Sequence, residues 1–138
     1  MSVLFKMKVS YFMHEEDVKE WLRFANMDLN TAKHLFETMY PKPYEIICYH
    51  CQQAAEKFIK AIFVLNQKEI VKTHDLVVLA KSLEGIYVPP VDILRLCAIL
   101  TPYGVRIRYP FEMPLEETDV KSALVYAEKI KIWSEQFF

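Results

Sequence analysis

Glycine is scarce in this sequence. Gly85 and Gly104 are the only glycines among 138 residues, so few tight hairpin turns are expected. Walker-type and dinucleotide-binding phosphate loops need several closely spaced glycines, and no segment of the chain supplies them. The scarcity of glycine therefore excludes both of these loop-based modes of phosphate binding.

The chain also lacks an excess of charge and a long apolar run. A formal net charge of −1 gives no global positive field for nucleic acid, so any such binding needs a local patch. No apolar run approaches the length of a membrane span, and the N-terminal MSVLFKMKVSYF is too short and too charged for a signal peptide. We therefore expect a cytoplasmic protein. Its 53% hydrophobic and 25% charged residues are typical of a globular chain, and residues 1–138 suit a single domain.

Three cysteines are too few for a disulfide framework. Cys48 and Cys51 resemble metal-ligand spacing, but no second cysteine or histidine pair completes a tetrahedral zinc site. A redox CxxC motif belongs at the start of a helix, whereas this pair lies inside one. We expect buried structural cysteines, no metal and no cofactor.

The stretch 44–65, YEIICYHCQQAAEKFIKAIFVL, is the centre of the predicted fold. Helical periodicity gathers its apolar residues on one stripe: Tyr44, Ile47, Cys48, Cys51, Ala54, Ala55, Phe58, Ile62 and Leu65. A polar row lies nearly opposite: His50, Gln53, Lys57 and Lys60. Gln52 and Glu56 fall on the flank between the two. One helix therefore supplies both a core seam and a compact polar face.

Similar periodicity predicts further helices at about 15–40, 75–84, 91–100 and 115–137. Pro41 and Pro43 end the first helix, and Thr73 or Asp75 can cap the short helix at 75–84. Residues 101–114 are expected to form an ordered loop, and residues 1–14 an N-terminal arm or a short strand. No sheet is expected. The predicted fold is an all-α, antiparallel, up-and-down four-helix bundle with an additional short helix.

The polar row offers groups that hold phosphate. Lysines one helical turn apart bind phosphate or an RNA backbone, and an arginine pair such as Arg106 and Arg108 clamps anions. Tyr109 follows directly and can stack on a base. For each group there is a simpler alternative: a solvated face for the row and surface salt bridges for the arginines.

Two further polar residues have open roles. His74 lies at a predicted helix start and is either a local brace or a ligand-binding group. Asp28 is either exposed or paired with a lysine of the central helix, which would orient that lysine.

With these residues in view, the chain resembles the HEPN family (higher eukaryote and prokaryote nucleotide-binding domain) over most of its length. Four pieces carry the resemblance in order: Trp21-x3-Ala25-x2-Asp28-Leu29-x2-Ala32, Tyr49-His50-x-Gln52-Gln53-Ala54-Ala55-Glu56-Lys57-x2-Lys60-Ala61, Lys72-Thr73-His74-Asp75-Leu76 and Arg108-Tyr109-Pro110. The resemblance implies an up-and-down bundle, a homodimer and a minimal nucleotidyltransferase partner in a toxin–antitoxin-like pair. It implies nucleotide binding in some branches and metal-independent RNA cleavage in others.

The ribonuclease branch is identified by an Arg followed four to six residues later by His. None of the four arginines here has a histidine in that window. Without that base, cleavage lacks a group to take the 2′-hydroxyl proton. We therefore expect a non-catalytic protein that binds a nucleotide or RNA phosphate through these residues: His50, Gln53, Lys57, Lys60, His74, Arg106, Arg108 and Tyr109. The alternatives are an endoribonuclease with a non-standard Arg/His pair and a purely structural dimeric module.

Overall fold

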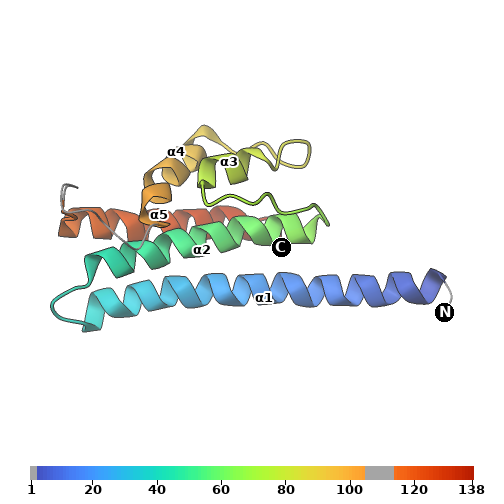
Figure 1. The fold of residues 1–138 in the computed structure, drawn as a ribbon, viewed down its shortest axis with the longest axis horizontal. Coiled ribbons are helices and arrows are strands. Elements are labelled where there is room, and N and C mark those ends of the chain that lie inside the picture. The colour runs from blue at the N-terminus through green and yellow to red at the C-terminus, as the bar shows by residue number, and fades with distance from the viewer. Residues whose placement is uncertain (1–2, 105–113) are drawn as a thin grey trace.

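The computed structural model describes residues 3–104 and 114–138, with side chains described from residue 15 onward. Helices are the only regular secondary structure among the described residues, which confirms the predicted all-α fold class. The elements follow in chain order: α1 (Val3–Thr38), α2 (Tyr44–Leu65), α3 (Leu76–Lys81), α4 (Val91–Leu100), the 3₁₀ helix η1 (Thr101–Gly104) and α5 (Glu117–Glu135). Figure 1 shows α2 and α5 running in one direction and α1 in the opposite direction.

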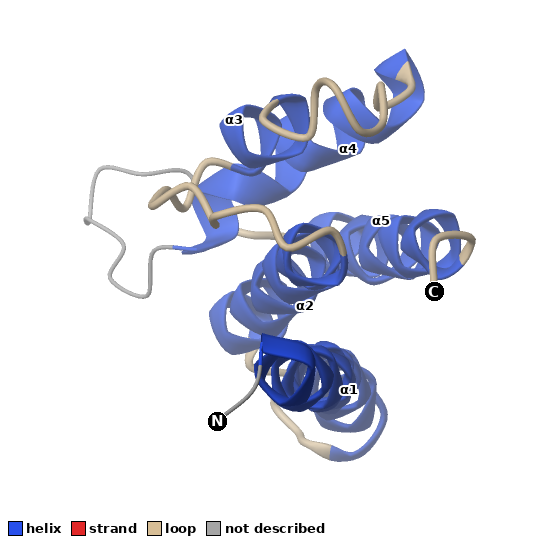
Figure 2. Ribbon diagram, turned by 90° about the vertical axis from the view of Figure 1, so that its right-hand side faces the viewer, coloured by secondary structure: helices blue, strands red, loops and turns tan. Residues whose placement is uncertain are grey.

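Helix α2 is the central element of the fold. It packs against α1, α5, α3, α4 and η1, and Figure 2 shows it between α1 on one side and α3 with α4 on the other. The middle of its predicted apolar stripe is buried: Ile47, Cys48, Cys51, Ala54, Ala55, Phe58 and Ile62 are each at most 1% exposed. Tyr44 and Leu65, at the two ends of the stripe, are half-buried. Alanines at the middle of the stripe let the neighbouring helices approach closely. The predicted bounds of this helix are confirmed.

Helix α1 is longer than the sequence pattern predicted. It begins at Val3 rather than Glu15, so the prediction of a short strand in residues 1–14 is wrong for residues 3–14. No glycine or proline interrupts the sequence before Pro41, and helix propagation costs little once the helix has formed. Figure 1 shows the N-terminal turns of α1 extending past the end of α2.

The smaller elements have clear start signals. Asp75 caps α3 because its side chain accepts hydrogen bonds from the backbone of Val77 and Val78, at 2.9 and 3.2 Å. Glu116 and Asp119 form a capping box at the start of α5. Residues 101–104, predicted as loop, form η1 instead. The predicted bounds of α4, 91–100, are confirmed. The other helix ends differ from prediction by a few residues, as helix ends usually do.

The cysteines are structural, as predicted. Cys48, Cys51 and Cys97 are fully buried, and none forms a disulfide. Burial raises the pKa of the Cys97 thiol to about 12 and that of the Cys51 thiol still further, so neither ionises near neutral pH. No helix among the described residues is both long and apolar enough to span a membrane.

Candidate functional site

Asp28 of α1 joins two members of the polar row on α2. Its carboxylate lies 2.9 Å from His50 Nδ1 through one oxygen, and its other oxygen accepts a hydrogen bond from Lys57 Nζ. The Asp28 side chain is 13% exposed, against 25% for His50 and 24% for Lys57. Of the two alternatives for Asp28, pairing with a lysine of the central helix is confirmed. We call these three residues the Asp28 triad.

Opposing effects act on the pKa of Asp28. Partial burial alone would raise it, but hydrogen bonds from His50 and Lys57, together with their charges, outweigh burial and lower the pKa below its usual value of 3.8. The carboxylate is therefore ionised at neutral pH. An ionised carboxylate only accepts hydrogen bonds, so the His50 ring must donate from Nδ1.

Glu56 makes a second set of contacts of the same kind. This residue of α2 is 4% exposed, and its carboxylate lies 3.2 Å from Lys60 Nζ and 3.0 Å from His74 Nδ1. The ring of His74 itself is mostly exposed to solvent. We call Glu56, Lys60 and His74 the Glu56 triad. In the part of the chain that the structure describes, Nε2 of neither His50 nor His74 has a hydrogen-bond partner.

The buried side-chain amide of Gln52 connects Glu56 to Gln53 of the polar row. Gln52, fully buried, accepts a hydrogen bond from Gln53 Nε2 at 2.7 Å and donates from its own Nε2 to Glu56 at 3.5 Å and to the His74 carbonyl at 3.4 Å. Gly104 packs directly over this amide: a Cβ at residue 104 would lie 2.9 Å from Gln52 Cδ. Only glycine fits there without movement of Gln52.

Five of the predicted site residues therefore fall into two connected sets. His50 and Lys57 meet on Asp28, whereas Gln53, Lys60 and His74 are joined through Gln52 and Glu56. Arg106, Arg108 and Tyr109 lie outside the described residues. Sequence reasoning placed Gln52 and Glu56 on a flank and gave them no role, yet both are buried among the site residues. The spacing of Glu56 four residues before Lys60, a standard helical ion pair, was the signal that could have identified Glu56.

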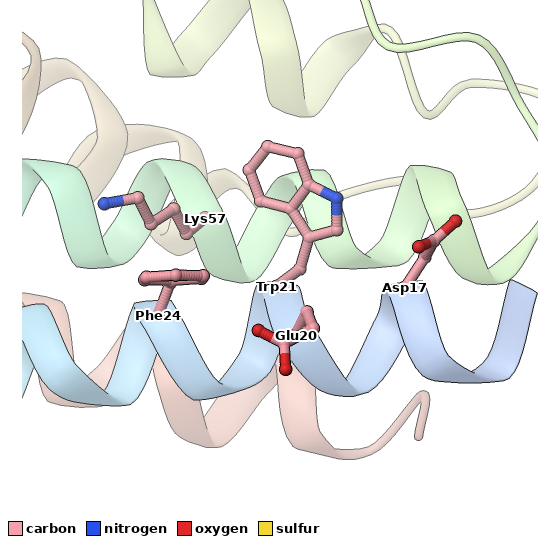
Figure 3. Close-up of a pocket in the computed structure, with 5 residues that line it drawn as sticks. All are labelled: Asp17, Glu20, Trp21, Phe24 and Lys57. Carbon is pink, nitrogen blue, oxygen red and sulfur yellow. The ribbon is translucent and has the colours of Figure 1, made fainter. Parts of the chain in front are cut away.

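Two hollows lie beside the Asp28 triad. The Trp21 hollow, about 380 Å³ in volume, is lined by Asp17, Glu20, Trp21, Phe24 and Lys57. Figure 3 shows the Trp21 indole extending from α1 across α2, with the Phe24 ring beside the Lys57 side chain.

The second, Tyr49 hollow has a volume of about 310 Å³ and is lined by Glu45, Ile46, Tyr49 and His50. The Trp21 side chain is half-buried and lines its hollow.

The arrangement can bind an anion through its lysines and can orient the rings of its histidines. An ammonium group has three N–H donors, so Lys57 and Lys60 each keep donors beyond those used on their carboxylates. A carboxylate on Nδ1 fixes an imidazole ring and its tautomer, as in hydrolases that use histidine as a base. Among the described residues, no group of three His, Cys, Asp or Glu side chains could hold a metal ion.

Comparison with known proteins identifies the family. The sequence profile described as "HEPN domain" matches residues 18–137. Among solved structures, ST0689, an archaeal HEPN homologue, is 25% identical with a TM-score of 0.70, over 86% of this chain and 95% of its own.

Two bacterial structures show the fold alone. TT1696 from Thermus thermophilus is 24% identical with a TM-score of 0.74, over 88% of this chain and 98% of its own. The HEPN domain protein tm0613 from Thermotoga maritima is 21% identical with a TM-score of 0.55, over 90% and 95%. No curated protein matches the chain. Because the HEPN profile covers most of the chain, including α2 and both triads, this protein belongs to the HEPN domain family.

Proposed function

We propose that this HEPN protein is a non-catalytic subunit that binds a nucleotide or RNA phosphate on the polar face of α2. The observation that carries the proposal is the pair of triads, because Asp28 and Glu56 hold Lys57, Lys60 and two histidines in fixed positions. Preorganised donors lose little conformational entropy when a ligand binds. His50, Gln53, Lys57 and Lys60 are all half-buried on this face, so their orientation is restricted before any ligand arrives.

The carboxylates also limit how strongly a bare phosphate binds. Each lysine charge is balanced by one carboxylate, so the positive field at this face is small. The charge interaction that remains should weaken with added salt. A nucleotide, which adds base contacts to phosphate contacts, should bind better than inorganic phosphate.

Thermal unfolding with added ligand tests this proposal. A nucleoside triphosphate or short RNA should raise the Tm of the wild type, because a ligand that binds only the folded state stabilises it by mass action, about 2.7 kcal/mol at a hundredfold excess over Kd. The double variant Lys57→Ala/Lys60→Ala should lose this shift. The matched control Lys121→Ala/Lys129→Ala, on the exposed side of α5, should keep it. Absence of a shift with every ligand, at pH 6 and low salt, would overturn the proposal.

A second function, metal-independent RNA cleavage, is favoured by one specific observation. Two histidines each have Nδ1 on a carboxylate, and Nε2 of each has no hydrogen-bond partner among the described residues. One imidazole would take the 2′-hydroxyl proton while the other protonates the 5′-oxygen leaving group, giving a 2′,3′-cyclic phosphate. Cleavage of RNA in the presence of a chelator, lost in both His50→Ala and His74→Ala, would establish it; intact RNA with wild-type protein would refute it.

The partners belong to the same proposal. The chain acts as a homodimer, which its family membership supports, and together with a minimal nucleotidyltransferase, which rests on the resemblance of its sequence motifs alone. Sedimentation of the purified chain at twice the monomer mass, and co-purification with a nucleotidyltransferase encoded beside it, are the expected results. Stable co-purification with no ligand response in either assay above would instead favour a purely structural module.

A further inference from the structure

The Trp21 and Tyr49 hollows lie on either side of the Asp28 triad. Lys57 of that triad lines the Trp21 hollow, and His50 lines the Tyr49 hollow. The two residues are two turns apart on α2, about 10 Å along the helix axis. A ligand that reaches from one hollow to the other must therefore pass the triad.

The two hollows have the same chemistry. Each is lined by both aromatic and carboxylate side chains: Trp21 and Phe24 with Asp17 and Glu20 in one, and Tyr49 with Glu45 in the other. Aromatic faces stack on nucleobases with little regard to sequence. Carboxylates repel phosphate but accept hydrogen bonds from the N–H groups of bases. The hollows are therefore suited to binding bases. The ammonium of Lys57 and Nε2 of His50, which lie between the two hollows, are suited to binding a phosphate.

From this order of base hollow, cation and base hollow, we infer that the ligand is a single-stranded nucleic acid that places two bases in the two hollows and the linking backbone phosphate against His50 and Lys57. This inference rests on the proposed phosphate-binding function and goes beyond it by naming the ligand class. Bases paired inside a duplex cannot enter such hollows, so a duplex should bind only through its backbone. A mononucleotide fills one hollow and should bind more weakly than a dinucleotide.

Tryptophan fluorescence provides the readout. Trp21 and Trp133 are the only tryptophans in the chain, so Trp133→Phe leaves Trp21 as the sole reporter. In this background a dinucleotide or short single strand should quench the emission of Trp21 and bind at least about tenfold more tightly than a mononucleotide, the order expected for one additional stacked base. A duplex of the same sequence should quench it less. RNA and DNA strands are titrated in parallel, and tighter binding of RNA would indicate a contact to the 2′-hydroxyl group.

Variants in the hollows that leave the reporter in place sharpen the test. Tyr49→Leu, which removes the ring but keeps an apolar side chain, should weaken dinucleotide binding about tenfold and leave mononucleotide binding at the Trp21 hollow unchanged. Phe24→Leu, at a residue that is 45% exposed and thus safe for folding, should weaken binding of both ligands. The matched control is Ile132→Ala, an exposed apolar residue on α5, which should change neither. Helical circular dichroism confirms that each variant is folded.

The outcomes separate this inference from the proposed function. Mononucleotide binding that depends on Lys57 and Lys60, with no gain for the dinucleotide and no effect of Tyr49→Leu, overturns the two-hollow inference and leaves phosphate binding intact. If the wild-type protein binds neither the mononucleotide nor the dinucleotide, both the two-hollow inference and the proposed phosphate-binding function are overturned. A dinucleotide gain that disappears in Tyr49→Leu and persists in Ile132→Ala supports the inference.

Discussion

At the residue scale, the two carboxylates determine how the basic residues of α2 are presented. Asp28 reaches across from α1 to bind His50 and Lys57 of α2. Glu56 lies on α2 itself and binds Lys60 of the same helix and His74 of the segment before α3. Neither lysine is a free surface cation. The consequence is that each carboxylate has two roles, since it stabilises the fold and it sets the charge that a ligand meets.

The substitution Asp28→Asn should lower the free energy of unfolding by about 1–2 kcal/mol at pH 7, because an amide is neutral and has one acceptor oxygen in place of two, so one hydrogen bond is lost and the other loses its charged acceptor. The pKa of Asp28 is lower in the folded chain than in the unfolded chain, so its stabilisation is fully present above about pH 3.9 and is lost as the pH falls through the folded value. Urea denaturation at pH 7 and at a series of lower pH values should show a difference in the free energy of unfolding between wild type and Asp28→Asn that is full at neutral pH and shrinks as the pH falls below about 3.9.

The matched control is Asp92→Asn on α4. Asp92 pairs with Arg95 at 3.6 Å, but both side chains are largely exposed, so its loss should cost well under 1 kcal/mol at either pH. If Asp28→Asn were as mild as this control at pH 7, the Asp28 triad would contribute no more than a surface ion pair.

At the element scale, the sequence predicts helices best where both ends carry stop or start signals. Pro41 and Pro43 precede α2 and its apolar stripe is continuous, so its bounds were predicted correctly. The start of α1 was missed because Lys alternates with apolar residues in residues 1–14, which resembles a strand, and helix length depends on the absence of a breaker. The sequence offered either Thr73 or Asp75 as the N-cap of α3, and only the structure identifies Asp75 as the cap.

Replacement of the α3 cap tests that distinction. Asp75→Ala should lower the free energy of unfolding by about 1 kcal/mol, the usual cost of losing an N-cap. Thr73→Ala should cost less, because the Thr73 hydroxyl accepts one hydrogen bond, from the backbone of Asp75, at 3.1 Å. Chemical denaturation of both variants measures the order. A larger loss for Thr73→Ala would contradict the assignment of Asp75 as the cap.

The close contact of η1 with α2 is possible because Gly104 has no Cβ atom to meet Gln52. Gly104→Ala should destabilise the fold by about 1–3 kcal/mol, because its methyl group would displace the buried amide of Gln52. The cost should shrink in a Gln52→Ala background, where the methyl group has room. A double-mutant cycle by denaturation measures this coupling. Equal costs in both backgrounds would show that Gln52 is not what Gly104 accommodates.

At the scale of the whole molecule, α2 is a site helix because the rest of the chain covers only part of it. α1 supplies Asp28 and Trp21 along one edge, while His74 and Gly104 close over Gln52 and Glu56 along the other. Helical periodicity predicted the row of His50, Gln53, Lys57 and Lys60. It did not predict that Gln52 and Glu56 are buried, because their burial is produced by segments far away in the sequence.

The most direct test of the central claim is an NMR titration of the ¹⁵N-labelled protein with a short single-stranded RNA at pH 6 and low salt. The claim predicts that the ring nitrogens of His50 and the backbone amides around Gln53, Lys57 and Lys60 shift with ligand, while those of the exposed face of α5 around Val125 and Lys129 do not. Uniformly small shifts, or shifts confined to α5, would contradict the claim that the polar face of α2 is the binding surface.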